Sequence, residues 1–334
     1  MKKKLVAAAL AAVLAAAALP SAVFAEEEKE LTKVTLNEVA HSIFYAPQYV
    51  AIEEGYFREE GLEIDLVNGF GADKVMTAVI SGEADIGFMG AEASVYAYQE
   101  GATDPVVNFA QLTQRAGNFL VAREEMPDFQ WSDLKGKKVL GGRKGGMPEM
   151  VFEYILRKNG IDPQKDLTID QSIDFGSTAA AFTGDASAEF TVEFEPSATA
   201  LEQEGAGYVV ASLGVDSGYV PYTSYSAKSS YMEEHPDIIQ KFTNGLQKGM
   251  EYVQTHTPEE IAEVIAPQFE ETDLDTITTI VTRYYEQDTW KENLIFEQES
   301  FELLQDILEE SGELNERVAY EQLVTTEYAK AAAE

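Results

Sequence analysis

The chain has 334 residues, of which 59 are Asp or Glu and 24 are Lys or Arg, so its formal charge is −35 at pH 7. This acidity disfavours nucleic acid and anionic lipid as partners, because both carry the same sign of charge. The chain contains no cysteine, which excludes thiol catalysis, cysteine-ligated metal and a lipid attached through an N-terminal cysteine.

Residues 1–25 have the layout of a secretory signal peptide. Lysines precede an alanine-rich apolar run at 5–19, and small residues precede the acidic stretch that begins at Glu26. The apolar run is short for a membrane-spanning helix, so we favour cleavage after Ala25 over the alternative, an N-terminal membrane anchor. We therefore predict an exported protein, soluble in a periplasm or outside the cell, that begins with an acidic linker at 26–31.

After this linker, strand and helix patterns alternate. Apolar patterns predict strands at 34–39, 62–66 and 85–89. They predict helices at 46–54 and 73–81, each followed directly by a glycine. This order of elements predicts an α/β fold with a mixed, mainly parallel sheet.

A second unit of the same kind begins near Trp131. Its predicted strands are 139–140, 167–169, 189–194 and 208–212, and its predicted helices are 148–158 and 196–204. From Tyr222 a short strand precedes long amphipathic helices, with apolar stripes through 239–253 and 301–308. A chain of this length exceeds one typical core and suits two lobes.

The segment "KVLGGRKGGMPEM", residues 138–150, places a glycine-rich turn between a strand and a helix. It lacks the Gly-Lys-Ser/Thr ending of a P-loop and the Gly-x-Gly-x-x-Gly spacing of a dinucleotide site. Free backbone N–H groups at a helix N-terminus, next to cations, favour a carboxylate, sulfonate or phosphate. The alternative is an ordinary glycine turn with solvated cations. The candidate residues of this anion site are Arg143, Lys144, Gly145, Gly146 and Met147.

Further candidates follow the other predicted strands, where ligands of open α/β sheets bind. Aromatic side chains there can stack on a flat ligand, although for most of these residues taken alone a structural role is the more frequent one. Their recurrence after successive strands in both units favours a shared cleft. The candidates are His41, Phe44, Tyr45, Gly71, Phe88, Gly90, Glu92, Gln114, Arg115, Glu195 and Tyr222.

No catalytic arrangement is evident in the sequence. There is no Gly-x-Ser-x-Gly elbow and no His-Glu-x-x-His motif, and no nucleophile has an evident base. The three histidines are too scattered to suggest a zinc site. We therefore expect neither catalysis nor a metal or cofactor. The alternative is an exported enzyme of the same fold with Glu92, Glu149 or Glu195 as acid or base.

Four stretches together carry a resemblance to a known family: "FYAPQYVAIEEGYFREEGLEIDL", "GEADIGFMG", "WSDLKGKKVLGGRKGG" and "FEPSATALEQEG". They resemble the substrate-binding proteins of ABC importers, in the branch for nitrate, sulfonate, taurine and thiamine-pyrimidine uptake. The resemblance implies a periplasmic-binding-protein-like fold of type II, with a hinge and a ligand cleft between two α/β lobes. The first lobe would comprise residues 32–124 and 221–334, and the second 125–220. Hinges would lie near 122–124 and 218–220.

The resemblance also implies the function. The protein would be a receptor that delivers a small solute to a membrane permease with its ATPase. From the candidate residues we expect an anionic solute, and we favour an aromatic heterocycle over an alkyl sulfonate or nitrate. We expect a monomer, because a receptor that opens and closes against a permease gains nothing evident from self-association. One relative of the fold is an enzyme of thiamine-pyrimidine synthesis that depends on a cysteine-rich iron-binding segment. That segment cannot exist in this chain, which has no cysteine.

Overall fold

The computed structural model describes residues 31–334 apart from residue 175. The predicted signal peptide and nearly all of the predicted acidic linker lie outside the described residues. Within residues 31–334 the strands form two five-stranded sheets. The first contains β1 (Thr32–Glu38), β2 (Leu62–Asn68), β3 (Ile86–Met89), β4 (Val106–Thr113) and β10 (Thr223–Lys228). The second contains β5 (Asn118–Ala122), β6 (Lys138–Leu140), β7 (Thr168–Asp170), β8 (Phe190–Phe194) and β9 (Tyr208–Ser212).

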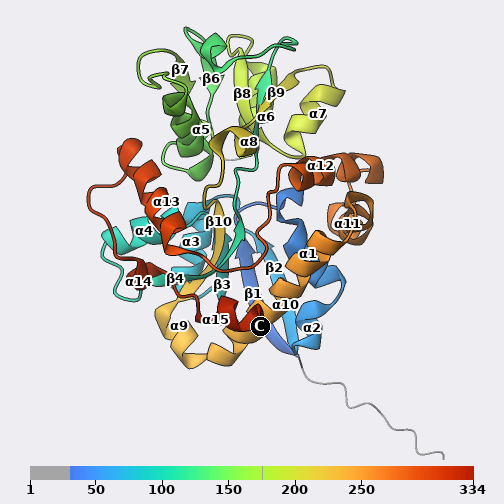
Figure 1. The fold of residues 1–334 in the computed structure, drawn as a ribbon, viewed down its shortest axis with the longest axis vertical. Coiled ribbons are helices and arrows are strands. Elements are labelled where there is room, and N and C mark those ends of the chain that lie inside the picture. Colours follow the sequence, from blue (N-terminus) through green and yellow to red (C-terminus); the bar gives the residue numbers. More distant parts are fainter. Residues whose placement is uncertain (1–30, 175) are drawn as a thin grey trace, which may run out of the picture. The chain divides into compact units, whose positions relative to one another are not determined.

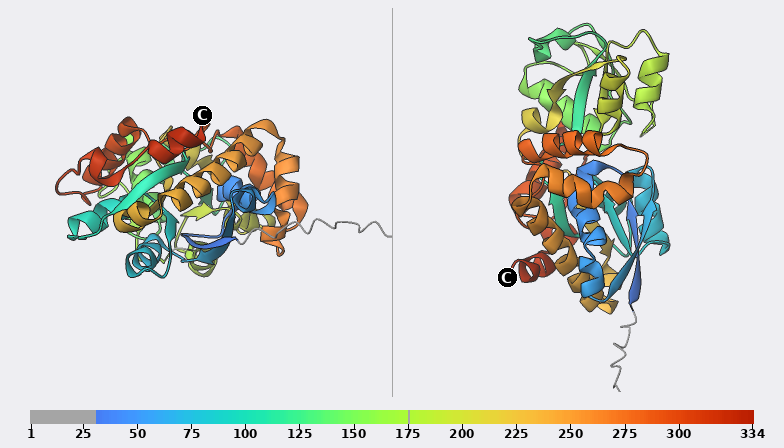
Figure 2. Two further views of the ribbon diagram at one scale, coloured as in Figure 1. Left: turned by 90° about the horizontal axis from the view of Figure 1, so that it is seen from below. Right: turned by 90° about the vertical axis from the view of Figure 1, so that its right-hand side faces the viewer.

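Helices cover both sheets (Figure 1). Those around the first sheet are η1 (Ile43–Tyr45), α1 (Ala46–Glu53), α2 (Tyr56–Glu59), α3 (Ala72–Ser81), α4 (Glu92–Gln99), α9 (Ser229–Glu234), α10 (Pro236–Thr255), α11 (Pro258–Ile265), η3 (Ala266–Phe269), α14 (Tyr320–Leu323) and α15 (Glu327–Ala332). Those around the second are η2 (Trp131–Leu134), α5 (Met147–Lys158), α6 (Thr178–Gly184), α7 (Ser197–Gln203) and α8 (Leu213–Ser217). Two further helices, α12 (Leu274–Glu286) and α13 (Gln298–Glu310), run along the border of the two groups, which Figure 2 shows from two other sides.

The two sheets have the same topology. Their strand orders are β2-β1-β3-β10-β4 and β7-β6-β8-β5-β9. In each sheet the first three strands are parallel, whereas β10 and β5 pair antiparallel with both of their neighbours. These reversed strands are the ones that enter from the other sheet. The predicted mixed α/β fold with mainly parallel sheets is therefore confirmed.

The apolar stripe predicted for α10 is the centre of the first core. Ile239, Phe242, Leu246 and Met250 are fully buried. Gly249 allows α10 to lie directly on α1, since a Cβ atom at this position would come within 2.3 Å of the carbonyl oxygen of Pro47. The predicted strands and helices up to residue 89 and from 139 to 212 are also present, with ends shifted by a few residues at most.

The chain crosses between the sheets twice, and the first crossing differs from the predicted hinge. It leaves the first sheet after Thr113 and enters the second at Asn118, whereas the hinge was expected near 122–124. The reason is β5, an entirely buried strand without alternation, which the sequence analysis did not predict. The return crossing lies between Ser217 and Thr223. We therefore propose that the second lobe begins near Asn118 and not at 125.

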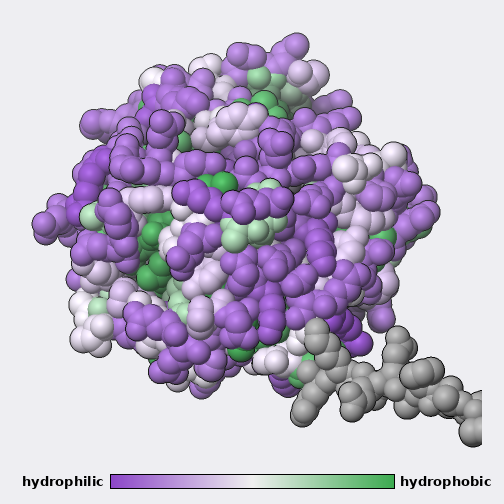
Figure 3. Space-filling view, turned by 60° about the horizontal axis from the view of Figure 1, so that its bottom comes forward, coloured by the Kyte–Doolittle hydropathy of each residue, from purple (hydrophilic) through white to green (hydrophobic). Residues whose placement is uncertain are grey.

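The face drawn in Figure 3 is mostly hydrophilic, with small scattered apolar patches. Among the described residues, no helix has both the length and the apolar character that crossing a membrane requires.

Candidate ligand-binding site

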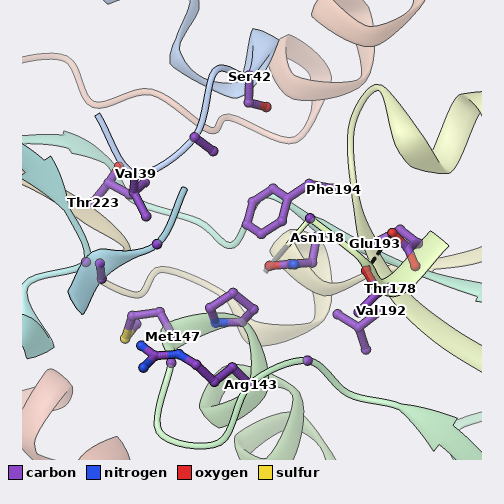
Figure 4. Close-up of a pocket in the computed structure, with 18 of the residues that line it drawn as sticks. Val39, Ser42, Asn118, Arg143, Met147, Thr178, Val192, Glu193, Phe194 and Thr223 are labelled. Atoms are coloured by element: carbon purple, nitrogen blue, oxygen red, sulfur yellow. Dashed lines mark hydrogen bonds between the residues drawn. The ribbon is translucent and has the colours of Figure 1, made fainter. Parts of the chain in front are cut away.

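A cavity of about 220 Å³ lies where strand ends of the two sheets face each other. From the first sheet it is lined by the segment after β1, the loop between β2 and α3, and the turn after β3. From the second sheet it is lined by the glycine loop after β6, the start of α5 and the end of β8. Figure 4 shows Arg143 and Met147 on one side of this space, Ser42 opposite, and Phe194 and Asn118 between them.

Most of the predicted site residues line this cavity. They are His41, Tyr45, Gly71, Gly90, Glu92, Arg143, Gly146, Met147, Glu195 and Tyr222. The expectation that strand-end loops of both units meet in one place thus agrees with the structure. What each of these residues binds stays a prediction.

Phe44 and Phe88 do not line the cavity. The Phe44 ring packs against the rings of Tyr45, Phe194, Tyr222 and Tyr284. The Phe88 ring stacks on Tyr225, with the ring centroids 4.1 Å apart. Both side chains are fully buried, so they belong to the core and not to the cavity wall.

Gln114 and Arg115 also lie outside the lining. They belong to the first crossing segment, where the Gln114 amide donates to the carbonyl of Asp288 and the Arg115 guanidinium donates to the carbonyl of Gly214. The Arg115 guanidinium also lies over the Tyr219 ring. These contacts connect the first crossing segment to α8, to the residues that follow α12 and, through the Tyr219 ring, to the return crossing.

Two residues of the predicted anion site already have partners within the chain. Lys144 forms an ion pair with Glu313 at 3.2 Å. The Gly145 N–H donates to Glu149 Oε2 at 3.3 Å, and its carbonyl accepts from the Tyr96 hydroxyl at 3.0 Å. Neither residue lines the cavity, because this part of the loop turns toward α4 and the start of α5.

Glu92 occupies the place expected for a ligand anion. Its carboxyl folds back over Gly90, where a Cβ atom would lie only 2.0 Å from Glu92 Oε2, so a larger residue at this position would displace the carboxyl. The side chain is 3% exposed, and Oε2 has no hydrogen-bond partner among the described residues. Burial raises the pKa of Glu92 to about 7, whereas the Met147 N–H and Arg143 favour the charged form. The chain's own carboxylate therefore faces the start of α5.

A second buried carboxyl group, Glu193, lies at the end of β8. It accepts from the hydroxyls of Thr178 at 2.9 Å and Thr191 at 2.6 Å. Figure 4 shows the Thr178 contact at the edge of the cavity. Burial raises the pKa of Glu193 to about 7. Glu193 was not predicted, although a glutamate between Val192 and Phe194 at the end of a predicted strand was a usable signal.

Asn118, Thr178 and Phe194 were missed as well. Asn118 begins the strand that was not predicted, and its side-chain oxygen accepts from the Tyr222 hydroxyl. Phe194 follows Glu193 at the strand end and packs against Phe44 and Tyr222. They add an amide and an aromatic wall to the candidate site.

The carboxyl of Glu195, a predicted site residue, already has hydrogen-bond and ion-pair partners within the protein. It is 1% exposed and accepts from the backbone N–H and the hydroxyl of Thr199, both at 2.9 Å. Arg283 of α12 forms an ion pair with Glu195 at 2.6 Å and with Glu202 at 2.7 Å. This cluster joins the border helix α12 to the second sheet.

Several further contacts connect the two sides of the cavity. The Ser42 hydroxyl donates to the Glu195 carbonyl at 3.0 Å, and Arg143 lies 3.7 Å from Asp73. Together with the Tyr96–Gly145 hydrogen bond and the Arg283 cluster, they hold the walls against each other. The structure therefore represents a closed arrangement of the cavity.

His41 lies in the cavity wall with both ring nitrogens next to acceptors. Nδ1 is 2.7 Å from Glu38 Oε1, and Nε2 is 2.8 Å from the carbonyl oxygen of Gln268. The hydrogen bond with Glu38 raises the pKa of His41 above its ordinary value, against the opposing effect of burial. Only the protonated ring can donate to both acceptors at once.

We expect the contribution of His41 to stability to depend on pH. Since its folded-state pKa is raised, this contribution is complete below the unfolded pKa of about 6.5 and is lost as the pH rises through the folded-state pKa. His41→Gln should therefore lower the free energy of unfolding more near pH 6 than near pH 9, measured by urea denaturation. An equal loss at both pH values would contradict the role of the proton.

No group of three or more His, Asp or Glu side chains within 31–334, residue 175 aside, is arranged to hold a metal ion. The candidate site therefore consists of two buried carboxyls besides the ion-paired Glu195, the amides of Asn68 and Asn118, His41, hydroxyls, one arginine and an aromatic and apolar wall. Such a set can accept hydrogen bonds from a solute and cover its flat or apolar faces.

The comparisons with known proteins point in the same direction. The family model described as NMT1/THI5 like matches residues 43–261. The protein YtlA of Bacillus subtilis (strain 168), whose name describes it as a binding protein, is 47% identical over 305 residues, covering 91% of each chain. More distant relatives are 4-amino-5-hydroxymethyl-2-methylpyrimidine phosphate synthase of Aspergillus parasiticus, 24% identical over 63% of each chain, and the formylaminopyrimidine-binding protein of Halalkalibacterium halodurans, 23% identical over 76% of each.

Solved structures share the fold. The alkanesulfonate-binding protein SsuA of Xanthomonas axonopodis pv. citri, bound to MOPS, superposes with a TM-score of 0.70 at 16% identity, covering 89% of this chain and 99% of that one. The periplasmic nitrate-binding protein NrtA of Synechocystis PCC 6803 gives a TM-score of 0.71 at 15% identity, covering 91% and 89%. These likenesses establish the periplasmic-binding-protein fold of the chain.

Proposed function

Since the chain belongs to the NMT1/THI5-like family, we propose that it is an exported, monomeric receptor that binds a small solute and delivers it to the permease of an ABC importer. The 47% identical relative is itself named as a binding protein. A cavity between two sheets that are joined by only two crossing segments suits a protein that opens and closes around its ligand.

The observation that carries the choice of solute is the pair of buried carboxyls, Glu92 and Glu193, in the cavity wall. Each presents oxygens that can accept hydrogen bonds from N–H groups. A buried carboxyl with too few hydrogen-bond donors is strongly stabilised by one further donor from a ligand. Arg143 supplies one positive charge to this wall, and it already lies beside Asp73 and Glu92. His41, the other cationic group of the wall, is paired with Glu38. The charge balance therefore favours a neutral or weakly basic solute over the anion expected from the sequence.

Aromatic residues in the cavity wall support the predicted aromatic character of the solute. Tyr45, Tyr222 and Phe194 present ring surface to the cavity from both sheets. Two relatives also have names that contain a pyrimidine. We propose an amino-substituted nitrogen heterocycle, with its N–H groups on Glu92 and Glu193 and its ring among the aromatic residues.

Two measurements test this proposal. Native mass spectrometry of the gently purified protein should show a co-purifying, unmodified compound of this class. Titration calorimetry with 4-amino-5-hydroxymethyl-2-methylpyrimidine should show saturable binding, and a thermal shift should accompany it, because a ligand at about 100 times its Kd adds about 2.7 kcal/mol to stability.

Glu193→Gln provides the matched test of the carboxyl assignment. It keeps the size and the acceptor oxygen but removes the charge, so we expect about a tenfold or greater loss of affinity for the aminopyrimidine. Binding of an alkanesulfonate or nitrate instead, with no binding of the aminopyrimidine, would refute the proposed solute class. Conversion of the added compound to a new mass would favour the alternative, an enzyme of the same fold.

A further inference from the structure

We propose that Phe70 is a solute-contacting residue that covers the ligand at the mouth of the cavity and helps to select a flat ring. This inference rests on the proposed function and adds a residue that the sequence analysis did not consider. Three observations carry it: the backbone conformation of Phe70, its exposure, and its position.

Phe70 has a backbone conformation that disfavours its own residue type. Its φ is +54°, one of only two positive values at non-glycine positions in the described chain. Left-handed conformations are adopted readily by Gly and Asn, whereas a bulky side chain is strained there. Such strain persists where the surroundings impose it, and it concentrates at ligand-binding positions.

The surroundings of Phe70 do impose this conformation. The N–H groups of Gly69 and Gly71 donate to the carbonyls of Glu38 and Val39 at 2.8 and 3.0 Å, which fixes the loop to the end of β1. Asn68 Oδ1 accepts from the Phe70 N–H at 3.0 Å. The turn would form equally well around a small residue, so its geometry does not explain why an aromatic residue is present.

Packing does not explain the aromatic residue either. The Phe70 side chain belongs to the exposed large apolar residues, at 63% exposure. It nevertheless lines the cavity together with Asn68, Gly71 and Ala72, and the lining of the other sheet includes Gly141 and Arg143. The Phe70 ring is therefore held on a strained backbone, at the cavity, and is largely exposed. Its apolar face is free to contact the ring of a solute.

The test compares stability and affinity in Phe70→Asn. Asparagine tolerates a positive φ, so this variant relieves the strain while it removes the ring. We expect the Tm of the ligand-free protein to stay equal or to rise by about 2 °C, and the affinity for 4-amino-5-hydroxymethyl-2-methylpyrimidine to fall about tenfold or more. Phe70→Tyr should bind more tightly than Phe70→Asn.

Ile80→Ala is the matched control. Ile80 is an exposed apolar residue of α3, 48% exposed, and does not line the cavity, so its truncation should leave the affinity unchanged. If the wild type binds the aminopyrimidine and Phe70→Asn binds it equally well, Phe70 has no ligand role and its ring serves another contact, such as the permease. A lower Tm with unchanged affinity would assign the ring to packing. If the wild type itself does not bind, the proposed solute class fails, and this inference fails with it.

Discussion

Replacing Arg283 by methionine is expected to lower the free energy of unfolding by about 3–5 kcal/mol, the range for breaking a buried ion pair from one side. The reason is Glu195, which is 1% exposed and loses its charged partner, the Arg283 guanidinium 2.6 Å away. The two hydrogen bonds from Thr199 remain, but they do not neutralise a buried carboxylate. Urea denaturation at neutral pH measures the loss.

Glu202→Gln is the matched control for this prediction. Glu202 is the other partner of Arg283, but its side chain is 30% exposed, so the loss should stay within about 1 kcal/mol. The double variant Glu195→Gln with Arg283→Met should regain part of the stability, because no buried charge is left unpaired. If Arg283→Met lowers the free energy of unfolding no more than Glu202→Gln does, the ion pair with Glu195 does not stabilise the folded protein as argued.

The helices and strands could be predicted more completely than the site residues, because the former depend on local sequence patterns and the latter on contacts between distant parts of the chain. Period-two and helical apolar patterns are local, and they located β1, β2, α3 and α10 to within a few residues at each end. Asn118–Ala122 is buried on both faces and shows no alternation, so β5 and the first crossing were missed. Its omission displaced the predicted hinge and hid Asn118.

The sequence predicted where in the fold the candidate site lies, but only some of the residues that form it. Strand-end loops identified His41, Gly90 and Glu92, because the carboxyl ends of parallel strands meet at one edge. The glycine loop was interpreted as an anion site since its N–H groups looked free. In the structure Glu149 accepts from Gly145, and Glu92 faces the start of α5. The Glu149 contact spans only four residues and is local. Glu92 lies far from α5 in the sequence, so its position at the start of this helix leaves no signal in the local sequence.

Replacing Glu92 by glutamine is expected to have opposite effects on stability and on solute binding. Burial raises the folded-state pKa of Glu92 to about 7, from an ordinary value of 4.5. The folded protein therefore binds this proton more tightly than the unfolded chain, and the stability of the ligand-free protein falls as the pH rises from about 4.5 through about 7. The groups that interact with Glu92 include Arg143, the Met147 N–H and the hydroxyls of Tyr45, Tyr96 and Tyr222.

Glutamine removes the cost of ionising a buried group. At pH values near 8, Glu92→Gln should raise the free energy of unfolding by roughly 2–3 kcal/mol, since one pKa unit corresponds to about 1.4 kcal/mol. The gain should shrink to nothing near pH 4.5. Affinity for the aminopyrimidine should meanwhile fall about tenfold or more, because the charged acceptor is lost. Chemical denaturation across this pH range and calorimetry near pH 8 measure the two effects.

Glu149→Gln separates the two effects. Burial and the neighbouring Glu153 raise the pKa of Glu149 to about 8, but Glu149 does not line the cavity. Its replacement should stabilise the ligand-free protein at high pH in the same way and leave solute affinity unchanged. A loss of affinity in both variants would indicate a general effect of charge on closure, and a loss in neither would remove Glu92 from the site. We expect a loss of affinity in Glu92→Gln alone, together with a gain in its stability. This result would show that the Glu92 carboxylate destabilises the ligand-free fold but binds the solute.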